Sequence, residues 1–244
     1  MGNTAGTLFA HVVFGSILAV VPWRSLLRYR RLRREVGAGN SDAKTRFYRA
    51  TVLWQLGVVA IVLCFWQVSG VPAAWLGLVL PAHFGLTAGL SAVSLLAIAT
   101  SIRALRTQGD KQLRLLHKSA GAILPQTTRE RRWFAALSVG AGISEEILTR
   151  GFLIFYLWQY LPGRVTWTVC ASAAVFGFCH LYQGWRYVLA TGFLGACLAS
   201  FYLITGSLLG PILVHAALDV RLIFIFTPAR MQSLGLQGSE LRSP

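Results

Sequence analysis

Charged residues are scarce in this sequence. Asp, Glu, Lys and Arg make up only 13% of its 244 residues, whereas about a quarter of the residues in a soluble domain are charged. The hydrophobic share is 55%, and the mean hydropathy is positive. This composition excludes an ordinary soluble domain and indicates a membrane protein.

Acidic residues are especially few, with 8 Asp and Glu against 23 Lys and Arg, for a net charge of +15. So basic a chain suggests a nucleic-acid partner, but the distribution of the charge argues against one. Nine basic residues lie in residues 24–49 and eight in 103–132, between apolar runs of spanning length. Such clustering is typical of cytoplasmic loops, which hold the basic residues of membrane proteins. We therefore expect a lipid bilayer as partner and no nucleic acid.

Paired cysteine spacings are absent. The four cysteines all fall in apolar segments, and no spacing suggests a disulfide framework or a zinc knuckle. We expect them to behave as small core hydrophobes. They are Cys64, Cys170, Cys179 and Cys197.

The first residues also lack the marks of a cleaved signal peptide. No basic region precedes the first apolar stretch, and no small-residue cleavage site follows it. We therefore expect residues 7–23 to form a retained span.

The long apolar runs predict an all-α polytopic membrane protein with seven to eight transmembrane helices in a single domain, residues 1–244. A helix needs about 17–25 apolar residues to cross the hydrocarbon core. Open strands cannot satisfy their backbone groups in lipid, so each run must be a helix. The seven runs are approximately 7–23, 50–69, 86–102, 133–160, 165–182, 187–205 and 208–227.

Two segments depart from this simple pattern. Residues 133–160 are too long for one perpendicular span, so we expect this helix to be tilted or broken near Gly140 and Gly142. Residues 71–84 are apolar but short and bracketed by prolines, and an interfacial or re-entrant helix there would make an eighth.

The basic loops predict the orientation. Residues 24–49 and 103–132 should be cytoplasmic, which puts the N-terminus outside and the C-terminus inside. We expect a multi-pass protein of the bacterial inner (plasma) membrane.

Ionisable residues within the later spans mark the second half of the chain, 133–227, as its functional half. A charge in the bilayer core costs several kcal/mol on most scales, about 2.5–3.5 kcal/mol on insertion scales, so such groups are functional candidates. The first three spans hold only His11, with His83 just outside a span. The later spans hold Glu145, Glu146, Arg150, His180, His215, Asp219 and Arg221.

Helical geometry sorts these residues into pairs. Glu146 and Arg150 are four apart, so they share a helix face, and His215 and Asp219 repeat that spacing. Glu145 is rotated by about 100° from Glu146 on an ideal helix, so the two acids must face different partners. We expect Glu146 and Arg150 to neutralise each other and to hold Glu145 towards a cavity.

Each group also has a purely structural interpretation. Glu146 and Arg150 would by themselves be read as a structural ion pair, and His180 as a core histidine bonded to a carbonyl. Asp219 could pair with Arg221 or cap a kink. Three helices that all carry such costly groups nevertheless favour function over scaffolding.

The set suits hydrolysis. A carboxylate and a histidine from different helices can hold a water while the carboxylate removes its proton, and further polar groups can stabilise the oxyanion that forms. The sequence lacks "GxSxG" and "HExxH", and no local histidine is placed to activate Ser144, so serine catalysis is not expected.

The segments "EEILTR" (145–150), "FGFCH" (176–180) and "HAALD" (215–219) resemble the three motifs of the CPBP family. These intramembrane endopeptidases comprise the type II CAAX prenyl proteases and the bacteriocin-processing Abi proteins, with patterns EExxxR, FxxxH and HxxxN or HxxxD. The order of the motifs fits, and the similarity covers about residues 130–225.

The resemblance implies a CAAX-protease-type-II-like fold and proteolysis at the membrane. It implies that Glu145 activates water with His180 as its partner, and that Glu146 and Arg150 orient the base. His215 and Asp219 would form the oxyanion side. An ionised Asp219 would repel an oxyanion, so it must be protonated or must instead orient His215.

No cofactor is assigned from the residues, and a metal stays possible. Glu145, His180 and His215 could form the two-His, one-carboxylate set of a catalytic zinc, and the family has been described both as metalloproteases and as glutamate proteases. We favour metal-independent glutamate catalysis.

Two other functions compete with proteolysis. An ion- or proton-coupled transporter also uses buried carboxylates and histidines, but it often has an inverted repeat, and the first half of this chain has no counterpart of the polar groups. A non-catalytic chaperone or immunity protein would not need intact motifs. We expect the substrate to be a membrane-associated protein or peptide, such as a C-terminal tail, a sorting signal or a peptide precursor.

Overall fold

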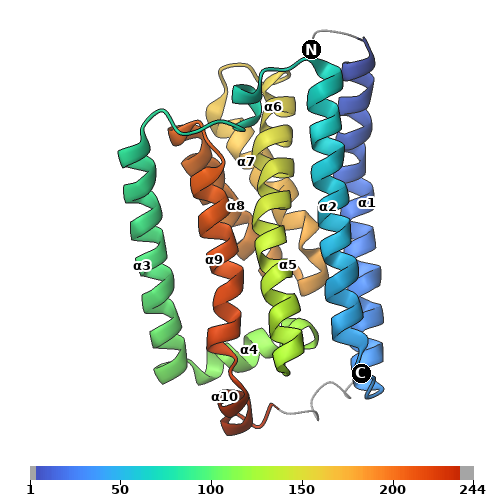
Figure 1. Ribbon diagram of the computed structural model, residues 1–244, viewed down its shortest axis with the longest axis vertical. Helices are drawn as coiled ribbons and strands as arrows, with labels where there is room; N and C mark the ends of the chain where they lie inside the picture. Colours follow the sequence, from blue (N-terminus) through green and yellow to red (C-terminus); the bar gives the residue numbers. More distant parts are fainter. Residues whose placement is uncertain (1–3, 237–244) are drawn as a thin grey trace.

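A computed structural model describes residues 4–236, and within that range it contains helices and loops but no strand (Figure 1). The prediction of an all-α membrane protein is thus confirmed. The α-helices are α1 (Thr4–Gly37), α2 (Ala43–Ser69), α3 (Phe84–Gln108), α4 (Asp110–Ala120), α5 (Thr128–Glu146), α6 (Leu153–Trp158), α7 (Val165–Cys179), α8 (Trp185–Thr205), α9 (Leu209–Ile225) and α10 (Pro228–Ser233).

Each of the seven apolar runs is helical, and four helices of the described chain are long and apolar enough to cross a bilayer by themselves. The four are α1, α2, α3 and α8. The shorter α7 is apolar as well, whereas α5 and α9 carry the charged motifs. The helices that carry or precede the three motifs, α5, α7 and α9, are therefore not among the four that are long and apolar enough to cross a bilayer by themselves.

The fourth run is interrupted, but at a different place from the one predicted. α5 continues without a break through Gly140 and Gly142, and residues Ile147–Phe152 then form a π-helical segment that leads into α6. The wider turn begins directly after Glu146. Short π segments inside helices frequently occur at functional sites.

The two glycines instead allow close packing of α5. A Cβ atom on Gly140 would lie 2.2 Å from Oε1 of Gln55 on α2, and one on Gly142 would lie 2.8 Å from the backbone nitrogen of Ala216 on α9. Both glycines thus mark helix contacts, and Gly142 brings α5 close to the part of α9 that carries His215.

Residues 71–84 also differ from the expected interfacial or re-entrant helix. They contain one turn of 3₁₀ helix, Ala73–Leu76, in an otherwise irregular segment. The backbone groups of this segment are bonded to the α8–α9 connection: Leu208 N–H donates to the Gly77 carbonyl at 3.1 Å, and the Ser207 hydroxyl donates to the Val79 carbonyl at 2.6 Å. Hydrogen bonds from the α8–α9 connection therefore satisfy backbone carbonyls that a longer helix would satisfy within itself.

The helices form a bundle in which α5 and α9 lie at the centre. In Figure 1, α3, α9, α5, α2 and α1 stand side by side, with α7 and α8 behind them. The closest helix pairs are α7 with α8, α5 with α9, α2 with α5, and α3 with α9. Two of the motif-bearing helices, α5 and α9, are therefore direct neighbours, whereas α7 packs chiefly against α8.

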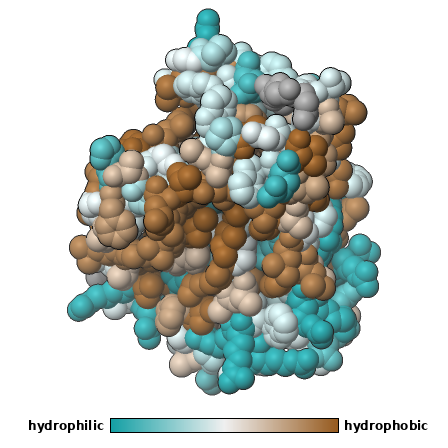
Figure 2. Space-filling view, turned by 45° about the horizontal axis from the view of Figure 1, so that its top comes forward, coloured by the Kyte–Doolittle hydropathy of each residue, from teal (hydrophilic) through white to brown (hydrophobic). Residues whose placement is uncertain are grey.

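The basic residues gather at one end of the bundle. The connections α1–α2 and α3–α5 both lie at the lower end in Figure 1, together with α4 and α10, and Figure 2 shows hydrophilic residues concentrated there. Three side chains of α1 and α2 bind backbone carbonyls at the end of α4 and in the α4–α5 connection: Tyr29 at Ser119, Tyr48 at Ile123 and Lys44 at Leu124. This end is therefore held together by polar contacts across helices.

The helix α7 is short. Its 15 residues rise about 22 Å, less than the roughly 30 Å thickness of the hydrocarbon core. His180 and the 3₁₀ turn Leu181–Gln183 follow its last residue directly. The α7–α8 connection therefore ends within the depth of the bundle and brings His180 there.

The cysteines are free, as expected, but they are not core residues. Cys64, Cys170 and Cys197 are exposed on the bundle, and Cys179 is half-buried. The reason is that the outer surface of a membrane protein faces lipid, so small apolar side chains are stable on it as well as in the core.

Candidate active site

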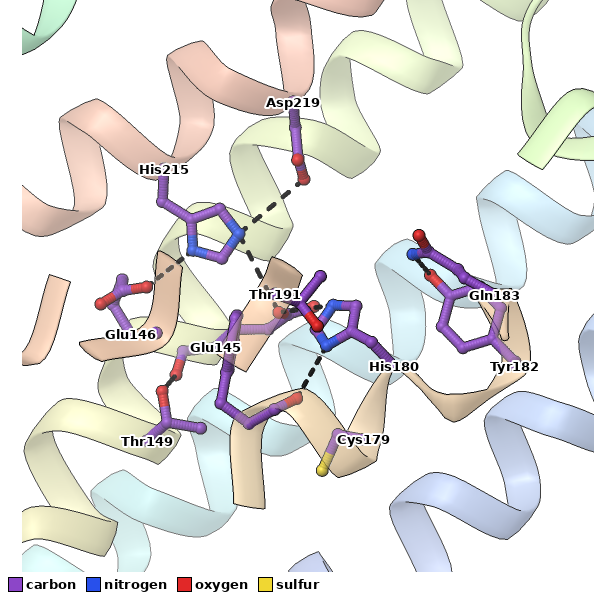
Figure 3. Close-up of polar contacts among 12 residues, drawn as sticks. Glu145, Glu146, Thr149, Cys179, His180, Tyr182, Gln183, Thr191, His215 and Asp219 are labelled. Carbon is purple, nitrogen blue, oxygen red and sulfur yellow. Dashed lines mark hydrogen bonds and ion pairs between the residues drawn. The ribbon is translucent and has the colours of Figure 1, made fainter. Parts of the chain in front are cut away.

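All six site residues predicted from the sequence come together between α5, α7 and α9 (Figure 3). Glu145 and Glu146 end α5, His180 follows the last residue of α7, and His215 lies on α9. Arg150 belongs to the π-helical segment, and Asp219 lies one turn after His215. Three elements far apart in the sequence thus build one polar centre.

Glu146 and Arg150 form the predicted ion pair. Nη1 of Arg150 lies 3.0 Å from Oε1 of Glu146, and both side chains are 0% exposed. Arg150 also donates to the Gly195 carbonyl at 3.0 Å, and its guanidinium lies 4.3 Å from the ring centre of Phe176. A buried charge is stable only when it is paired and hydrogen-bonded, so this set of contacts is what keeps Arg150 in the core.

Thr149, which the sequence reasoning did not select, connects the pair to Glu145. Its hydroxyl donates to the backbone carbonyl of Glu145 and accepts from Nη1 of Arg150. The carbonyl of Thr149 in turn accepts from the Ser172 hydroxyl on α7 at 3.2 Å. Thr149 thus bonds the π-helical segment to the end of α5 and to α7. No local sequence pattern indicates these hydrogen bonds.

The hydrogen bonds of the two histidines define which nitrogen faces the centre. Nδ1 of His180 lies 2.9 Å from the Phe176 carbonyl, and Nδ1 of His215 lies 2.6 Å from Oε1 of Glu146. A carbonyl only accepts, and so does a carboxylate paired with arginine, so both Nδ1 atoms carry the proton. The Nε2 atoms of both rings therefore point to the centre of the site.

Glu145 is the point on which both rings converge. Its Oε2 lies 3.8 Å from Nε2 of His180 and 4.0 Å from Nε2 of His215. These distances are too long for direct hydrogen bonds, and such a spacing suits one bridging water. Glu146 faces Arg150 and His215 instead. The two adjacent acids thus have different partners, as the helical geometry predicted.

Asp219 and Glu145 form the accessible side of the site. Their side chains are 38% and 35% exposed, whereas those of Glu146 and Arg150 are fully buried. Oδ2 of Asp219 lies 3.9 Å from Nε2 of His215. Within residues 4–236 no ion pair joins Asp219 to Arg221, so the proposed pairing of these two residues is not seen. The two partly exposed carboxylates therefore lie on the open side of the site, and the Glu146–Arg150 pair lies on its closed side.

The donor set also fits a metal ion in its chemistry. Nε2 of His180, Nε2 of His215 and Oε2 of Glu145 are free lone-pair donors, and each histidine has an outer hydrogen-bond partner of the kind that metal ligands usually have. In the described part of the chain, however, no three His, Cys, Asp or Glu side chains are grouped closely enough to hold a metal as they stand.

A separate surface hollow of about 640 Å³ lies between the end of α6 and the start of α7, at the opposite end from the basic loops. It contains none of the six residues, so we assign the site from the polar geometry rather than from the shape of the surface. Its lining residues are Tyr160, Leu161, Arg164, Trp167, Cys170 and Ala171.

The fold and the site define a class of protein: a polytopic all-α membrane protein whose carboxylates and histidines converge from three helices. Residues 128–221 match the family described as type II CAAX prenyl endopeptidase Rce1-like. The matched segment begins with α5 and includes all six residues. The match covers less than half of the chain and is consistent with a CPBP intramembrane endopeptidase, which confirms the resemblance. Comparison with curated proteins and with solved structures gives no match.

Proposed function

We propose that this integral membrane endopeptidase hydrolyses a peptide bond of a membrane-associated protein or peptide with a water that Glu145 activates. The observation that carries the proposal is the convergence of both Nε2 atoms on Oε2 of Glu145, at 3.8 and 4.0 Å. The Rce1-like domain supports CAAX-type endopeptidase activity in general. The water mechanism and the nature of the substrate are our inference.

In the proposed reaction, a water donates one hydrogen bond to Glu145 and another to a histidine Nε2 atom. Glu145 removes a proton as the water oxygen bonds to the carbonyl carbon of the substrate, and the carbonyl π electrons move to its oxygen. The tetrahedral intermediate then collapses and breaks the C–N bond, and the departing amine takes the proton from Glu145. A positioned base contributes about 10²–10⁴-fold to such a step.

The remaining groups hold this base and its partners in place. Glu146 bonds both Arg150 and Nδ1 of His215, so one buried carboxylate links α5 to α9. Through Thr149, Arg150 also contacts the backbone of Glu145. We infer that the catalytic helices lie within residues 133–227 and that the first three spans serve as scaffold and substrate guide.

Zinc bound by Glu145, His180 and His215 would supply a water of lowered pKa. As a zinc ligand, however, Glu145 would no longer be free to act as the base. Glu146 could not replace it, since Arg150 and His215 already occupy it. We therefore propose metal-independent glutamate catalysis.

The transporter function considered above finds no support. The family match is to an endopeptidase domain, and in the described chain the paired ionisable groups of the membrane interior lie on α5, α7 and α9 and the segments that directly follow them.

The test is cleavage of an internally quenched CAAX-type peptide, farnesylated or unmodified, by the purified protein in detergent. Glu145→Gln and His180→Ala should each lower the rate by about 10²–10⁴-fold, because the base or its partner is lost. Glu35→Gln and His83→Ala remove the same chemical groups at exposed or peripheral positions and serve as controls. Near-normal cleavage by Glu145→Gln would refute the mechanism.

A further inference from the structure

The proposed reaction needs a hydrogen-bond donor for the carbonyl oxygen, and the third motif does not supply one. Nδ1 of His215 donates to Glu146, and its Nε2 faces carboxylate oxygens of Glu145 and Asp219 at 4.0 and 3.9 Å. Any proton on that Nε2 is therefore directed at a carboxylate, and an ionised Asp219 has no proton to give. The donor must come from elsewhere in the site.

Tyr182 lies next to the site, in the 3₁₀ turn that directly follows His180. Its ring centre is 6.0 Å from that of His180, with an interplanar angle of 31°, and 5.2 Å from that of Tyr29 on α1. Figure 3 shows Tyr182 and Gln183 beside His180, on the side away from Glu146. Tyr182 thus flanks the accessible part of the site rather than its buried part.

The hydroxyl of Tyr182 is prepared to donate. Its oxygen accepts a hydrogen bond from Nε2 of Gln183 at 2.9 Å, which polarises the O–H bond and strengthens it as a donor. A tyrosine keeps its proton at neutral pH. Within residues 4–236 no group accepts that proton, so it is available to a ligand.

Three neighbouring hydroxyls, two of threonines and one of a tyrosine, are committed to backbone carbonyls. Thr149 donates to Glu145, Thr191 donates to Tyr187 at 2.6 Å, and Tyr29 donates to Ser119. In contrast to these three hydroxyls, that of Tyr182 has a proton that the described part of the chain leaves unused.

We propose that Tyr182 donates the hydrogen bond that stabilises the oxyanion of the tetrahedral intermediate, with Gln183 as the positioning residue that polarises it. This inference rests on the proposed function. Tyr182 transfers no proton in this step. Its O–H donates a hydrogen bond to the oxyanion while Glu145 holds the proton taken from the water. This hydrogen bond weakens again when the C–N bond breaks and the carbonyl re-forms. In this arrangement Asp219 orients His215 and does not face the oxyanion, so its carboxylate does not repel the negative charge of the intermediate.

The test compares Tyr182→Phe with Tyr29→Phe, which removes a hydroxyl from the adjacent ring but not from the site. The substrate is the internally quenched CAAX-type peptide. Loss of one oxyanion donor costs about 10²–10³-fold in kcat, and we expect that loss in Tyr182→Phe with KM changed by no more than about twofold. Gln183→Leu should lower kcat by a smaller factor, and Tyr29→Phe should have a normal kcat. Tyr182→Phe and Gln183→Leu should retain the unfolding temperature of the wild type, whereas Tyr29→Phe should unfold at a lower temperature because it loses its hydrogen bond to the Ser119 carbonyl.

A second measurement separates this role from packing. A peptide phosphinate carries an oxyanion at the position of the scissile carbonyl, so it should bind Tyr182→Phe about 10²–10³-fold more weakly than wild type, while the parent peptide binds both equally. If Tyr182→Phe folds poorly, Gln183→Leu tests the proposal instead. A lower kcat and weaker phosphinate binding in Gln183→Leu would support the role of Tyr182, and normal values would overturn it.

The outcomes distinguish the two proposals. A wild type that cleaves, a Glu145→Gln variant that does not, and a Tyr182→Phe variant with normal kcat and phosphinate affinity would overturn the role of Tyr182 alone. A wild type that cleaves no peptide and binds no phosphinate would overturn the proposed function, and the role of Tyr182 with it.

Discussion

Glu146 carries more of the site's architecture than its place beside the proposed base suggests. Its Oε1 bonds Arg150 within the same helical run and Nδ1 of His215 from α9. Its Oε2 is buried and has no hydrogen-bond partner among the described residues. One carboxylate oxygen thus joins the ion pair to the histidine, and a change at Glu146 must be felt at both.

We therefore predict that Glu146 and Arg150 act through each other. Glu146→Gln or Arg150→Met alone leaves an uncompensated buried charge and should lower stability by about 3–5 kcal/mol. The double variant should recover stability relative to either single one, yet stay inactive because Thr149 and His215 lose their shared partners. Thermal unfolding and turnover of all four proteins measure this. Strictly additive stability losses would contradict the pairing.

Whether a metal takes part can also be tested at the scale of residues. If Glu145 is the base of a metal-free reaction, extended treatment with a chelator should leave the cleavage rate unchanged. Added zinc should inhibit, because it would occupy the lone pairs of Glu145, His180 and His215 that hold the water. Metal content by mass spectrometry and rates before and after chelation are the readouts. Loss of activity on chelation, restored by zinc, would show a metalloprotease.

The local pairs of the site could be predicted from spacing and the approach of His180 to Glu145 from the family resemblance, but the other long-range contacts could not be predicted. Spacing alone predicted that Glu146 meets Arg150 and that Glu145 faces elsewhere. The 2.6 Å contact between Glu146 and His215 joins residues 69 apart, and no spacing rule covers that. Tyr182 and Thr149 were missed because a tyrosine or a threonine beside a motif is ordinarily packing, and only its hydrogen bonds reveal another role.

At the scale of elements, the site depends on how closely α5 approaches α9. Gly142 lies against Ala216, the residue after His215, and a Cβ atom at Gly142 would be 2.8 Å from the Ala216 nitrogen and 2.9 Å from its Cβ. The sequence placed a helix break near this glycine, because glycine weakens a helix. The structure instead uses its missing side chain for packing, which only the position of the neighbouring helix reveals.

We predict that Gly142→Ala separates α5 from α9. Overpacking of this kind lowers stability by about 1–3 kcal/mol. The shift of α5 should also lengthen the contact between Glu146 and His215, so turnover should fall even though the protein stays folded. Gly57→Ala on α2 is the matched control, since a Cβ there meets nothing within 4 Å. Unfolding temperature and turnover of both variants give the comparison. If Gly142→Ala and Gly57→Ala both kept the turnover of the wild type, the close contact between α5 and α9 would not be needed for activity.

At the scale of the molecule, the charge distribution predicts how the chain is oriented in the membrane. Of the four acidic groups near the basic end within residues 4–236, three form ion pairs: Glu35 with Arg31 and Arg46, Asp42 with Arg129, and Asp110 with Arg230. Basic residues outnumber acidic ones there, which suits a surface that faces the cytoplasm and anionic lipid headgroups.

We predict that this end is cytoplasmic in the bacterial inner membrane, with the N-terminus outside and the C-terminus inside. Single cysteines introduced as Ser41→Cys, Gln112→Cys and Ala82→Cys sample the two basic connections and the opposite end, at exposed positions. The native cysteines must first be replaced, because three of them are exposed. An impermeant thiol reagent added to intact cells should label Ala82→Cys alone. Labelling of Ser41→Cys or Gln112→Cys would invert the topology.

The shortness of α7 has a consequence for the lipid around the protein. A helix of about 22 Å with an exposed outer face does not match a 30 Å layer. The acyl chains beside α7 must bend or thin to meet it, so the bilayer is dented at the place where the α7–α8 connection holds His180. We expect headgroups and water to reach deeper beside α7 than beside the longer helices α1 and α2. The length of the surrounding acyl chains thereby becomes a control on how easily a tethered peptide reaches Glu145.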